Sequence, residues 1–235
     1  MPAEGIVSMA APSASDMVVV VTGGDPVDPT HLLDLPPGAR VIAADSGVEH
    51  ALLVGLSVHH VVGDFDSASP EALATAEAAG AKLERHPTAK DATDLELALD
   101  AALELGARRI HVLGGHGGRL DHLLANLLLL ARPQHVDVTV TAQMGAARVA
   151  VVRDAATLQG AIGDLVTLLP LHGPARGVTT TGLLYPLAGE DLPDGTTRGV
   201  SNELLHDPAT VTLAAGVLVT IQPGHPGTHH LEIPR

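Results

Sequence analysis

The chain has 235 residues, which suits one large domain or two modest ones, and it carries 27 acidic side chains against 13 lysines and arginines. This negative balance argues against nucleic acid as a partner, because sequence-independent binding needs a basic surface that neutralises phosphates. There is no cysteine and no apolar run of the roughly 18 residues that a membrane span needs, which argues against disulfides, thiolate metal sites and a membrane partner and makes the cytoplasm the expected compartment.

The first half of the chain alternates between short apolar runs and helical patterns. The apolar runs are dense in Val, Ile and Leu, as strands buried on both faces are, and they cover residues 17–21, 41–44, 60–62, 110–113 and 136–141. Helices are expected between them, most of them stopped by a glycine or a proline, at residues 48–53, 70–79, 93–105 and 119–132. This alternation predicts an α/β domain with a mostly parallel, Rossmann-like sheet and helices on both faces.

The second half has a different pattern, with short β-branched segments separated by Gly, Pro and Asp-Gly turns. The expected strands cover residues 149–152, 165–169, 178–181, 196–200, 210–213 and 217–221. They predict an antiparallel, β-sandwich-like domain. We therefore expect an α/β domain at residues 17–145, a β-rich domain at residues 146–224, and loose tails at residues 1–16 and 225–235.

Polar and glycine residues follow the predicted parallel strands at their carboxyl ends, where ligands bind in sheets of this kind. Asp45 follows one strand, and Asp64 and Asp66 follow the next. Two carboxylates that are two residues apart face the same way in extended backbone, and their repulsion is relieved by a cation between them. Magnesium prefers oxygen ligands, so the sequence predicts a magnesium site here. Asp45 alone also fits a simple turn.

The predicted helix at residues 93–105 begins in a third acidic segment. Thr93 and Glu96 fit the Ser/Thr-x-x-Glu pattern of a capping box, which is a structural role. Capping leaves Asp91 and Asp94 available for a ligand, and we expect them to join the carboxylates of the neighbouring strand ends.

A glycine-rich loop at residues 114–118 precedes the last predicted helix. Its backbone N–H groups and the positive end of the helix dipole suit phosphate, and Arg119 adds a two-pronged donor. The loop lacks the GxGxxG and GKS/GKT patterns of the two familiar nucleotide sites, and a flexible turn with a solvated arginine is the alternative. His116 and His122 also lie in this segment, but the predicted phosphate site does not need them as metal ligands.

Five segments together resemble the signature blocks of the thiamine pyrophosphokinases, over about residues 18–221. The blocks are ADSG at 44–47, VGDFDS at 62–67, KDATDLELAL at 90–99, GGRLDH at 117–122 and GVSNE at 199–203. The resemblance implies transfer of the pyrophosphoryl group of ATP to the hydroxyl of thiamine, giving thiamine diphosphate and AMP. It also implies Mg²⁺, an ATP-binding α/β domain, a thiamine-binding β-rich domain, and a homodimer with active sites near the subunit interface.

The resemblance also implies roles for single residues. Those expected to be catalytic are Asp64, Asp66, Asp91 and Asp94, with Asp64, Asp66 and Asp91 as metal ligands and Asp94 also expected to orient the thiamine hydroxyl. Those expected to bind ATP are Asp45, Lys90, Gly117, Gly118, Arg119 and Asp121, although Asp121 also fits a first-turn acid that favours the helix dipole. Those expected to bind thiamine are Asp94, Ser201 and Asn202, the last two with a turn as the alternative.

The chain departs from the family pattern in its aromatic residues. Some family members stack thiamine on an aromatic side chain, whereas this chain has no tryptophan and only the rings of Tyr185 and Phe65. Either aliphatic side chains replace stacking or the acceptor pocket differs. Two other functions compatible with the same carboxylates are a metal-dependent nucleotide hydrolase and a non-catalytic nucleotide sensor, and a related pyrophosphokinase with another acceptor is a further alternative.

Overall fold

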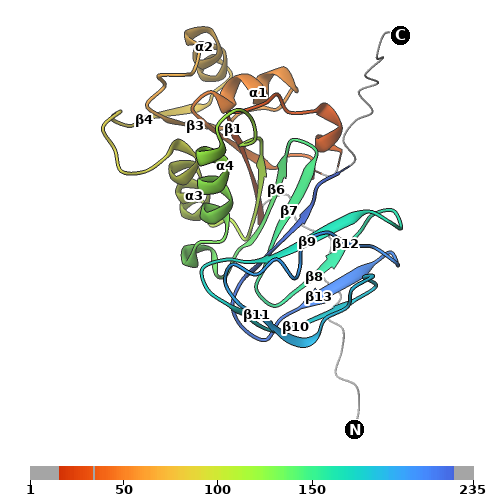
Figure 1. The fold of residues 1–235 in the computed structure, drawn as a ribbon. Coiled ribbons are helices and arrows are strands. Elements are labelled where there is room, and N and C mark those ends of the chain that lie inside the picture. The colour runs from red at the N-terminus through yellow and green to blue at the C-terminus, as the bar shows by residue number, and fades with distance from the viewer. Residues whose placement is uncertain (1–15, 34, 225–235) are drawn as a thin grey trace, which may run out of the picture.

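The computed structural model describes residues 16–33 and 35–224, so the two predicted tails lie outside it except for Asp16. The described chain forms two sheets (Figure 1). The larger has ten strands in the order β12-β9-β14-β7-β6-β5-β1-β2-β3-β4, and the smaller has four in the order β11-β10-β13-β8. The predicted combination of a mostly parallel α/β sheet with an antiparallel β-rich part is confirmed.

Six strands form the parallel part of the large sheet, with β1 near its centre and buried along its whole length. They are β1 (Met17–Thr22), β2 (Arg40–Ala44), β3 (His60–Gly63), β4 (Lys82–Arg85), β5 (Arg109–Leu113) and β6 (Thr139–Met144). β4 was not predicted, because its sequence KLER is that of a half-exposed edge strand. β6 begins three residues later than predicted, since Pro133–His135 form a 3-10 turn (η3) and Val136 donates its N–H to Pro133 O.

Helices cover both faces of this parallel part, as predicted. On one face, α3 (Asp94–Glu104) and α4 (Leu120–Leu130) pack on the side chains of Val18 and Val20. On the other face, α1 (Gly47–Leu53) and α2 (Pro70–Ala78) pack on Val19 and Val21. A short 3-10 helix, η2 (Pro29–Leu32), precedes β2. Successive side chains of β1 point to opposite faces of the sheet and thus belong to two separate apolar cores.

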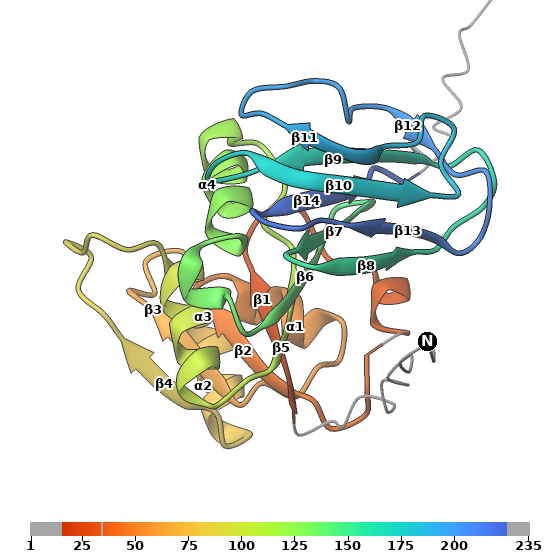
Figure 2. The same ribbon diagram turned by 90° about the horizontal axis from the view of Figure 1, so that it is seen from below.

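The large sheet continues through the antiparallel hairpin of β6 and β7, which turns at Gly145. The remaining strands of the large sheet are β7 (Ala147–Val152), β14 (Leu218–Gln222), β9 (Leu165–Pro170) and β12 (Asn202–Glu203). The small sheet packs on them across an apolar core that includes Leu168, Leu218, Val178 and Val211 (Figure 2). Its strands are β8 (Ala155–Leu158), β10 (Ala175–Thr181), β11 (Ala188–Leu192) and β13 (Ala209–Thr212). The division into domains near residue 145 stays a prediction.

The strand predicted at residues 196–200 is wrong. These residues form successive turns in which Val200 donates its N–H to Thr197 O, and Gly199 lies against the backbone of Leu168 too closely for a side chain. Strands β8 and β11 were not predicted, because their sequences AATL and AGEDL lack an apolar run. Among the residues that the structure describes, no helix is long and apolar enough to cross a bilayer.

Candidate active site

A cleft of about 490 Å³ lies at the carboxyl ends of β1, β2, β3 and β5 and at the N-termini of α3 and α4. The predicted site residues that line it are Asp45, Asp64, Asp66, Asp94, Gly117 and Arg119. The predicted residues outside its lining are Lys90, Asp91, Gly118, Asp121, Ser201 and Asn202. The phosphate-handling segments are therefore brought together in one chain, whereas the GVSNE block is not brought to them.

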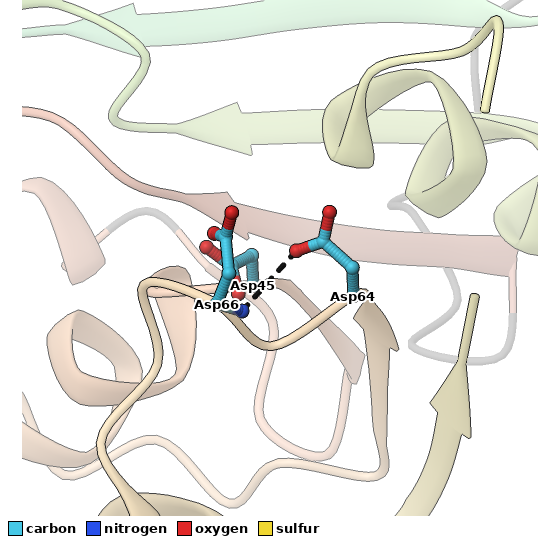
Figure 3. Close-up of side chains that lie close together, drawn as sticks. All are labelled: Asp45, Asp64 and Asp66. Carbon is cyan, nitrogen blue, oxygen red and sulfur yellow. Dashed lines mark hydrogen bonds between the residues drawn. The ribbon is translucent and has the colours of Figure 1, made fainter. Parts of the chain in front are cut away.

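Three carboxylates converge on one side of this cleft. Asp45, Asp64 and Asp66 each offer an oxygen within 4.8 Å of the other two (Figure 3). Asp45 is 7% exposed, and its Oδ1 has no hydrogen-bond partner among the described residues. Burial raises the pKa of Asp45, and the charges of Asp94, Asp66 and Asp64 raise it further against a hydrogen bond from the Ser46 backbone. Converging charge and a buried unpaired oxygen are what a divalent cation would relieve, so the donor set fits such an ion.

The loop after β3 reaches this cluster through a turn, unlike the extended backbone that the sequence suggested. The Asp66 N–H donates to Asp64 Oδ1 at 3.2 Å, which is the dashed line in Figure 3. Phe65 between them has a φ of +63° and is buried, with the Arg85 guanidinium 4.6 Å from the centre of its ring. Asp64 and Asp66 converge because of this strained turn rather than because of strand alternation.

Gly63 permits the close approach of three acidic elements. A Cβ on Gly63 would lie 2.9 Å from Asp94 Oδ1 and 3.3 Å from the Asp45 Cα, and its φ of +153° already disfavours a side chain. Asp45 itself has a φ of +45°, which is uncommon outside glycine. The backbone is therefore strained at the cluster, as is common where a ligand site is built.

Lys90 balances part of this negative charge. Its Nζ lies 2.8 Å from Asp64 Oδ2 and 3.0 Å from Asp94 Oδ1, and its side chain is mostly buried. The hydrogen bond from Lys90 lowers the pKa of Asp64. Burial alone would lower the pKa of Lys90, but the bonds to Asp64 and Asp94 outweigh it and raise that pKa. Asp91 is exposed and lies outside the three-carboxylate cluster, so its role as a ligand stays a prediction.

The N-terminus of α3 contains half of the predicted capping box. Thr93 Oγ1 accepts a hydrogen bond from the Glu96 N–H at 3.3 Å, so Thr93 is the N-cap. The Glu96 carboxylate instead pairs with Arg132, whose Nη1 is 3.0 Å from Glu96 Oε1. This ion pair ties the first turn of α3 to the segment that follows α4.

Two glycine-containing loops form the opposite wall of the cleft. The Asp25 N–H donates to His116 O at 2.6 Å, and the Gly115 N–H donates to Gly23 O at 2.9 Å. A side chain on Gly24 would collide with His116 O, so the two loops pack backbone to backbone. The imidazole of His116 lies 3.1 Å from the Asp25 carboxylate and lines the cleft. The sequence did not predict this pair, because its members are 91 residues apart.

Arg119 stands at the start of α4, and no side chain of the described residues caps this helix. The N–H groups of the first turn therefore keep their capacity for an anion. The Arg119 guanidinium is 2.6 Å from the Asp121 carboxylate, and both side chains are exposed. The hydrogen bond from Arg119 lowers the pKa of Asp121 to about 2. Asp121 thus holds the arginine at the mouth of the cleft.

Asn126 is a cleft residue that sequence reasoning missed. It is buried, and its Nδ2 donates to Gly115 O at 3.1 Å, which fixes the glycine loop to α4. A signal was present in the sequence, since Asn126 is the one polar residue in the run LLANLLLL.

Within the GVSNE block, the side chain of Asn202 is buried in the β-rich part. Asn202 is 4% exposed, its Nδ2 donates to Tyr185 O at 2.8 Å, and its Oδ1 accepts from the Tyr185 N–H at 2.9 Å. Ser201, with a φ of +56°, is exposed beside it. The side chain of Asn202 therefore clamps the segment that carries Tyr185, which agrees with the structural alternative for this residue.

Comparisons with known proteins agree on one family. Residues 38–142 match the family model of the thiamin pyrophosphokinase catalytic domain, and residues 155–218 match that of the thiamin pyrophosphokinase vitamin B1 binding domain. The thiamine pyrophosphokinase of Bacillus subtilis is 30% identical over 183 residues, which are 77% of this chain and 86% of that protein.

Solved structures agree with the sequence matches. The crystal structure of thiamine pyrophosphokinase from Bacillus subtilis has a TM-score of 0.77 at 27% identity, over 88% of this chain and 99% of that one. The structure from Geobacillus thermodenitrificans has a TM-score of 0.75 at 28% identity, over 90% and 99%. With the cleft, the two family models and these relatives in agreement, the chain belongs to the thiamine pyrophosphokinase family.

Proposed function

We propose that the chain transfers the pyrophosphoryl group of ATP to the hydroxyl of thiamine, giving thiamine diphosphate and AMP. The observation that carries this proposal is one cleft in which three converging carboxylates face a glycine loop and an uncapped helix N-terminus. An anion-binding wall opposite a cation-binding wall suits a metal-bound polyphosphate. The family membership supports ATP and thiamine as the two substrates.

The cation that we propose is Mg²⁺, held by Asp64 and Asp66 with Asp45 beside them. The three carboxylates offer oxygen ligands, which Mg²⁺ prefers, and Mg²⁺ commonly binds substrate phosphates through one or two carboxylates. When bound, the ion would neutralise charge on the triphosphate. Asp91 as a further ligand stays a prediction, because in this structure it is exposed and outside the cluster.

The protein side chains act by position and charge. Arg119 lines the cleft, and Lys90 is paired with two carboxylates that line it, Asp64 and Asp94; with the N–H groups of α4 these two cations would bind phosphate oxygens. Asp94 lines the cleft beside Lys90, where its carboxylate is placed to accept a hydrogen bond from the attacking hydroxyl. Little covalent work is required of the protein, since alignment and charge stabilisation dominate phosphoryl transfer.

We propose a homodimer as the way in which the acceptor pocket is completed. Ser201 and Asn202 do not line the cleft of their own chain, and apolar side chains near them, those of Leu184 and Val200, are exposed. The outer face of α4 carries a stripe of exposed leucines next to the cleft, with Leu120 at 68%, Leu124 at 53% and Leu128 at 47% exposed. Such a stripe is suited to burial against a second copy.

Tyr185 is the ring that we propose for contact with thiamine. Phe65 is buried beneath Arg85, whereas Tyr185 is 62% exposed and its backbone is held by Asn202. The pocket would then use this tyrosine for the aromatic contact that some family members make with thiamine.

A direct assay tests the reaction. Protein, ATP, Mg²⁺ and thiamine are incubated, and thiamine diphosphate and AMP are measured together. We expect equal amounts of both products and no AMP when thiamine is omitted. AMP or ADP release without thiamine would indicate a nucleotide hydrolase, and no product in either case would contradict the proposal. Cytoplasmic location stays a prediction of the sequence.

Subunit mixing tests the shared site. An Asp64→Asn protein and a Ser201→Ala/Asn202→Ala protein are mixed under conditions in which labelled subunits exchange. If each site uses the cleft of one chain and the turn of the other, heterodimers contain one unaltered site and recover part of the activity. No recovery despite proven exchange would mean that each site is built from one chain.

A further inference from the structure

A second cavity, of about 390 Å³, lies on the face of the large sheet beside η2 and β8. Strands β5, β6, β7 and β14 supply its floor. Its lining residues include Arg109, Arg148, His31 and His111, and we call it the basic cavity. Its volume is in the range of small-molecule sites.

The charge of the basic cavity is opposite to that of the chain. Within the part of the chain that the structure describes, no aspartate or glutamate lines it, although the protein has 27 acidic residues against 13 lysines and arginines. Four threonines and three glutamines supply most of the other polar lining. Cationic side chains surrounded by neutral donors are the usual composition of an anion site.

Strand alternation places Arg109 and His111 on one face of the large sheet. Arg109 and His111 are two residues apart on β5, while Ile110 and Val112 between and after them are buried in the helix-covered core. His111 is opposite Thr141 on β6, and their side chains are hydrogen-bonded at 2.8 Å. The expectation that these strands are apolar on both faces is therefore wrong for β5, which alternates.

The arginines retain donors for a ligand. Arg109 is half-buried and has no ion pair among the described residues, and Arg148 donates one hydrogen bond, from Nη2 to Gln159 O at 2.6 Å. A half-buried guanidinium without a counter-ion costs free energy that a bound anion would recover. Because a guanidinium has five N–H donors in a planar fork, it matches the oxygens of a phosphate group.

We propose that the basic cavity binds a small phosphate-bearing anion at a site separate from the phosphate cleft. The two sites adjoin without sharing lining residues. Gln143 lies between them: its side chain faces the basic cavity and donates to Gly145 O at 2.8 Å, and its backbone O accepts from the Gly114 N–H of the glycine loop at 3.0 Å. A ligand in the basic cavity would therefore be one residue away from the phosphate-binding loop.

Calorimetric titration with inorganic pyrophosphate tests this site. The background is Arg119→Ala, which removes the phosphate-binding arginine of the cleft, and the buffer contains EDTA so that metal-dependent binding to the carboxylates is absent. We expect one site to remain in this background. Arg109→Gln added to it should weaken the site about tenfold or more, since hydrogen bonds to charged groups are among the stronger ones. Arg148→Gln should also weaken it.

Two further variants complete the test. Arg176→Gln removes an exposed arginine of the small sheet and should leave the affinity unchanged, whereas Arg109→Lys keeps the charge and should retain more affinity than Arg109→Gln. Because Arg148 is exposed, Arg148→Gln carries the test if Arg109→Gln does not fold. Loss of all binding in the Arg119→Ala background, or binding that neither Arg109→Gln nor Arg148→Gln weakens, would overturn the proposal.

Discussion

The phosphate cleft and the turn at Ser201 and Asn202 both contain residues of the signature blocks. They differ in whether their polar groups already have hydrogen-bond partners within one chain. In the cleft, three carboxylates converge, and Asp45 Oδ1 has no hydrogen-bond partner in the part of the chain that the structure describes. In the turn, the amide of Asn202 is already bonded on both sides to the backbone of Tyr185. Polar groups left unsatisfied indicate where a ligand must enter, and satisfied ones indicate what supports the fold.

Removing one carboxylate of the cluster is the strongest test of the difference between the cleft and the turn. Asp64→Asn should lower kcat by about a hundredfold or more while the protein stays folded, because a bound metal ion supplies several kcal/mol of charge stabilisation. The measurement is activity against Mg²⁺ concentration, with thermal unfolding in parallel. Asp137→Asn, an exposed carboxylate before β6, is the matched control. Ordinary activity of Asp64→Asn at low Mg²⁺ would remove the cluster from the mechanism.

Asp91→Asn sharpens the same experiment, since Asp91 is exposed and outside the cluster. A loss as large as that of Asp64→Asn would show that Asp91 joins the ligand set when substrate is bound. A smaller loss would leave the metal to Asp45, Asp64 and Asp66.

A second variant tests the opposite wall of the cleft. Arg119→Ala should lower kcat/KM for ATP by about ten- to a hundredfold, because a charge-assisted hydrogen bond contributes about 1.5–3 kcal/mol. Direct binding of thiamine should change less. Asp121→Asn, which releases Arg119 from its ion pair, should have a smaller effect than Arg119→Ala. Wild-type kinetics of Arg119→Ala at limiting ATP would make the arginine a bystander.

For the turn, we expect an effect on stability as well as on thiamine. Asn202→Ala leaves the N–H and the O of Tyr185 unpaired, which should lower the free energy of unfolding by about 1–3 kcal/mol. The KM for thiamine should rise while that for ATP is spared, since Asn202 lies outside the cleft. Urea unfolding and steady-state kinetics measure the two effects. Equal weakening of both substrates would mean that the block is structural alone.

The smallest expected effect is a gain in stability, whereas the variants above lose activity or stability. Burial and neighbouring charges raise the pKa of Asp45, so its ionised form is disfavoured in the fold, and its contribution to stability is lost as the pH rises through the folded pKa. Near neutral pH in EDTA, Asp45→Asn should therefore raise the unfolding midpoint. A gain of about 1 kcal/mol corresponds to about 2–4 °C in a chain of this size.

Added Mg²⁺ should reverse the order of the two unfolding midpoints. The wild-type protein should gain stability from the ion, and Asp45→Asn should gain less, because one ligand oxygen is replaced. A lower midpoint for Asp45→Asn in EDTA would mean that the unpaired oxygen of Asp45 carries no cost.

The parts of the fold that were predictable are those in which local pattern and burial agree. β1 and β2 are apolar runs buried inside the parallel part of the large sheet, and they were predicted within one residue. β8 and β11 lie at the edges of the small sheet and contain no run of Val, Ile or Leu, so no local pattern marks them. Residues 196–200 have β-branched character, yet Asp194-Gly195 and Gly199 impose turns.

The same limit applies to the cleft. The carboxyl ends of parallel strands meet at one edge, which is why Asp45, Asp64 and Asp66 were found from the sequence. Which carboxylates meet most closely depends on the turn at Phe65 and on the bridge from Lys90, and these are tertiary features. The pairing of Asp25 with His116 joins residues 91 positions apart, and no spacing rule indicates it.

The hairpin of β6 and β7 has a consequence for how the enzyme moves. Gln143 pairs with Arg148 and Thr141 with Ala150, so the antiparallel strands of the large sheet are joined to the α/β part by a ladder of backbone hydrogen bonds. The small sheet packs on these antiparallel strands. A hinge between the two halves would have to break that ladder, at a cost that rigid-body closure in other kinases avoids by placing the hinge in a loop. Substrate would therefore be enclosed by movements of the loops at the carboxyl edge of the sheet. We expect such gating to be fast and local and to need no large change in molecular shape.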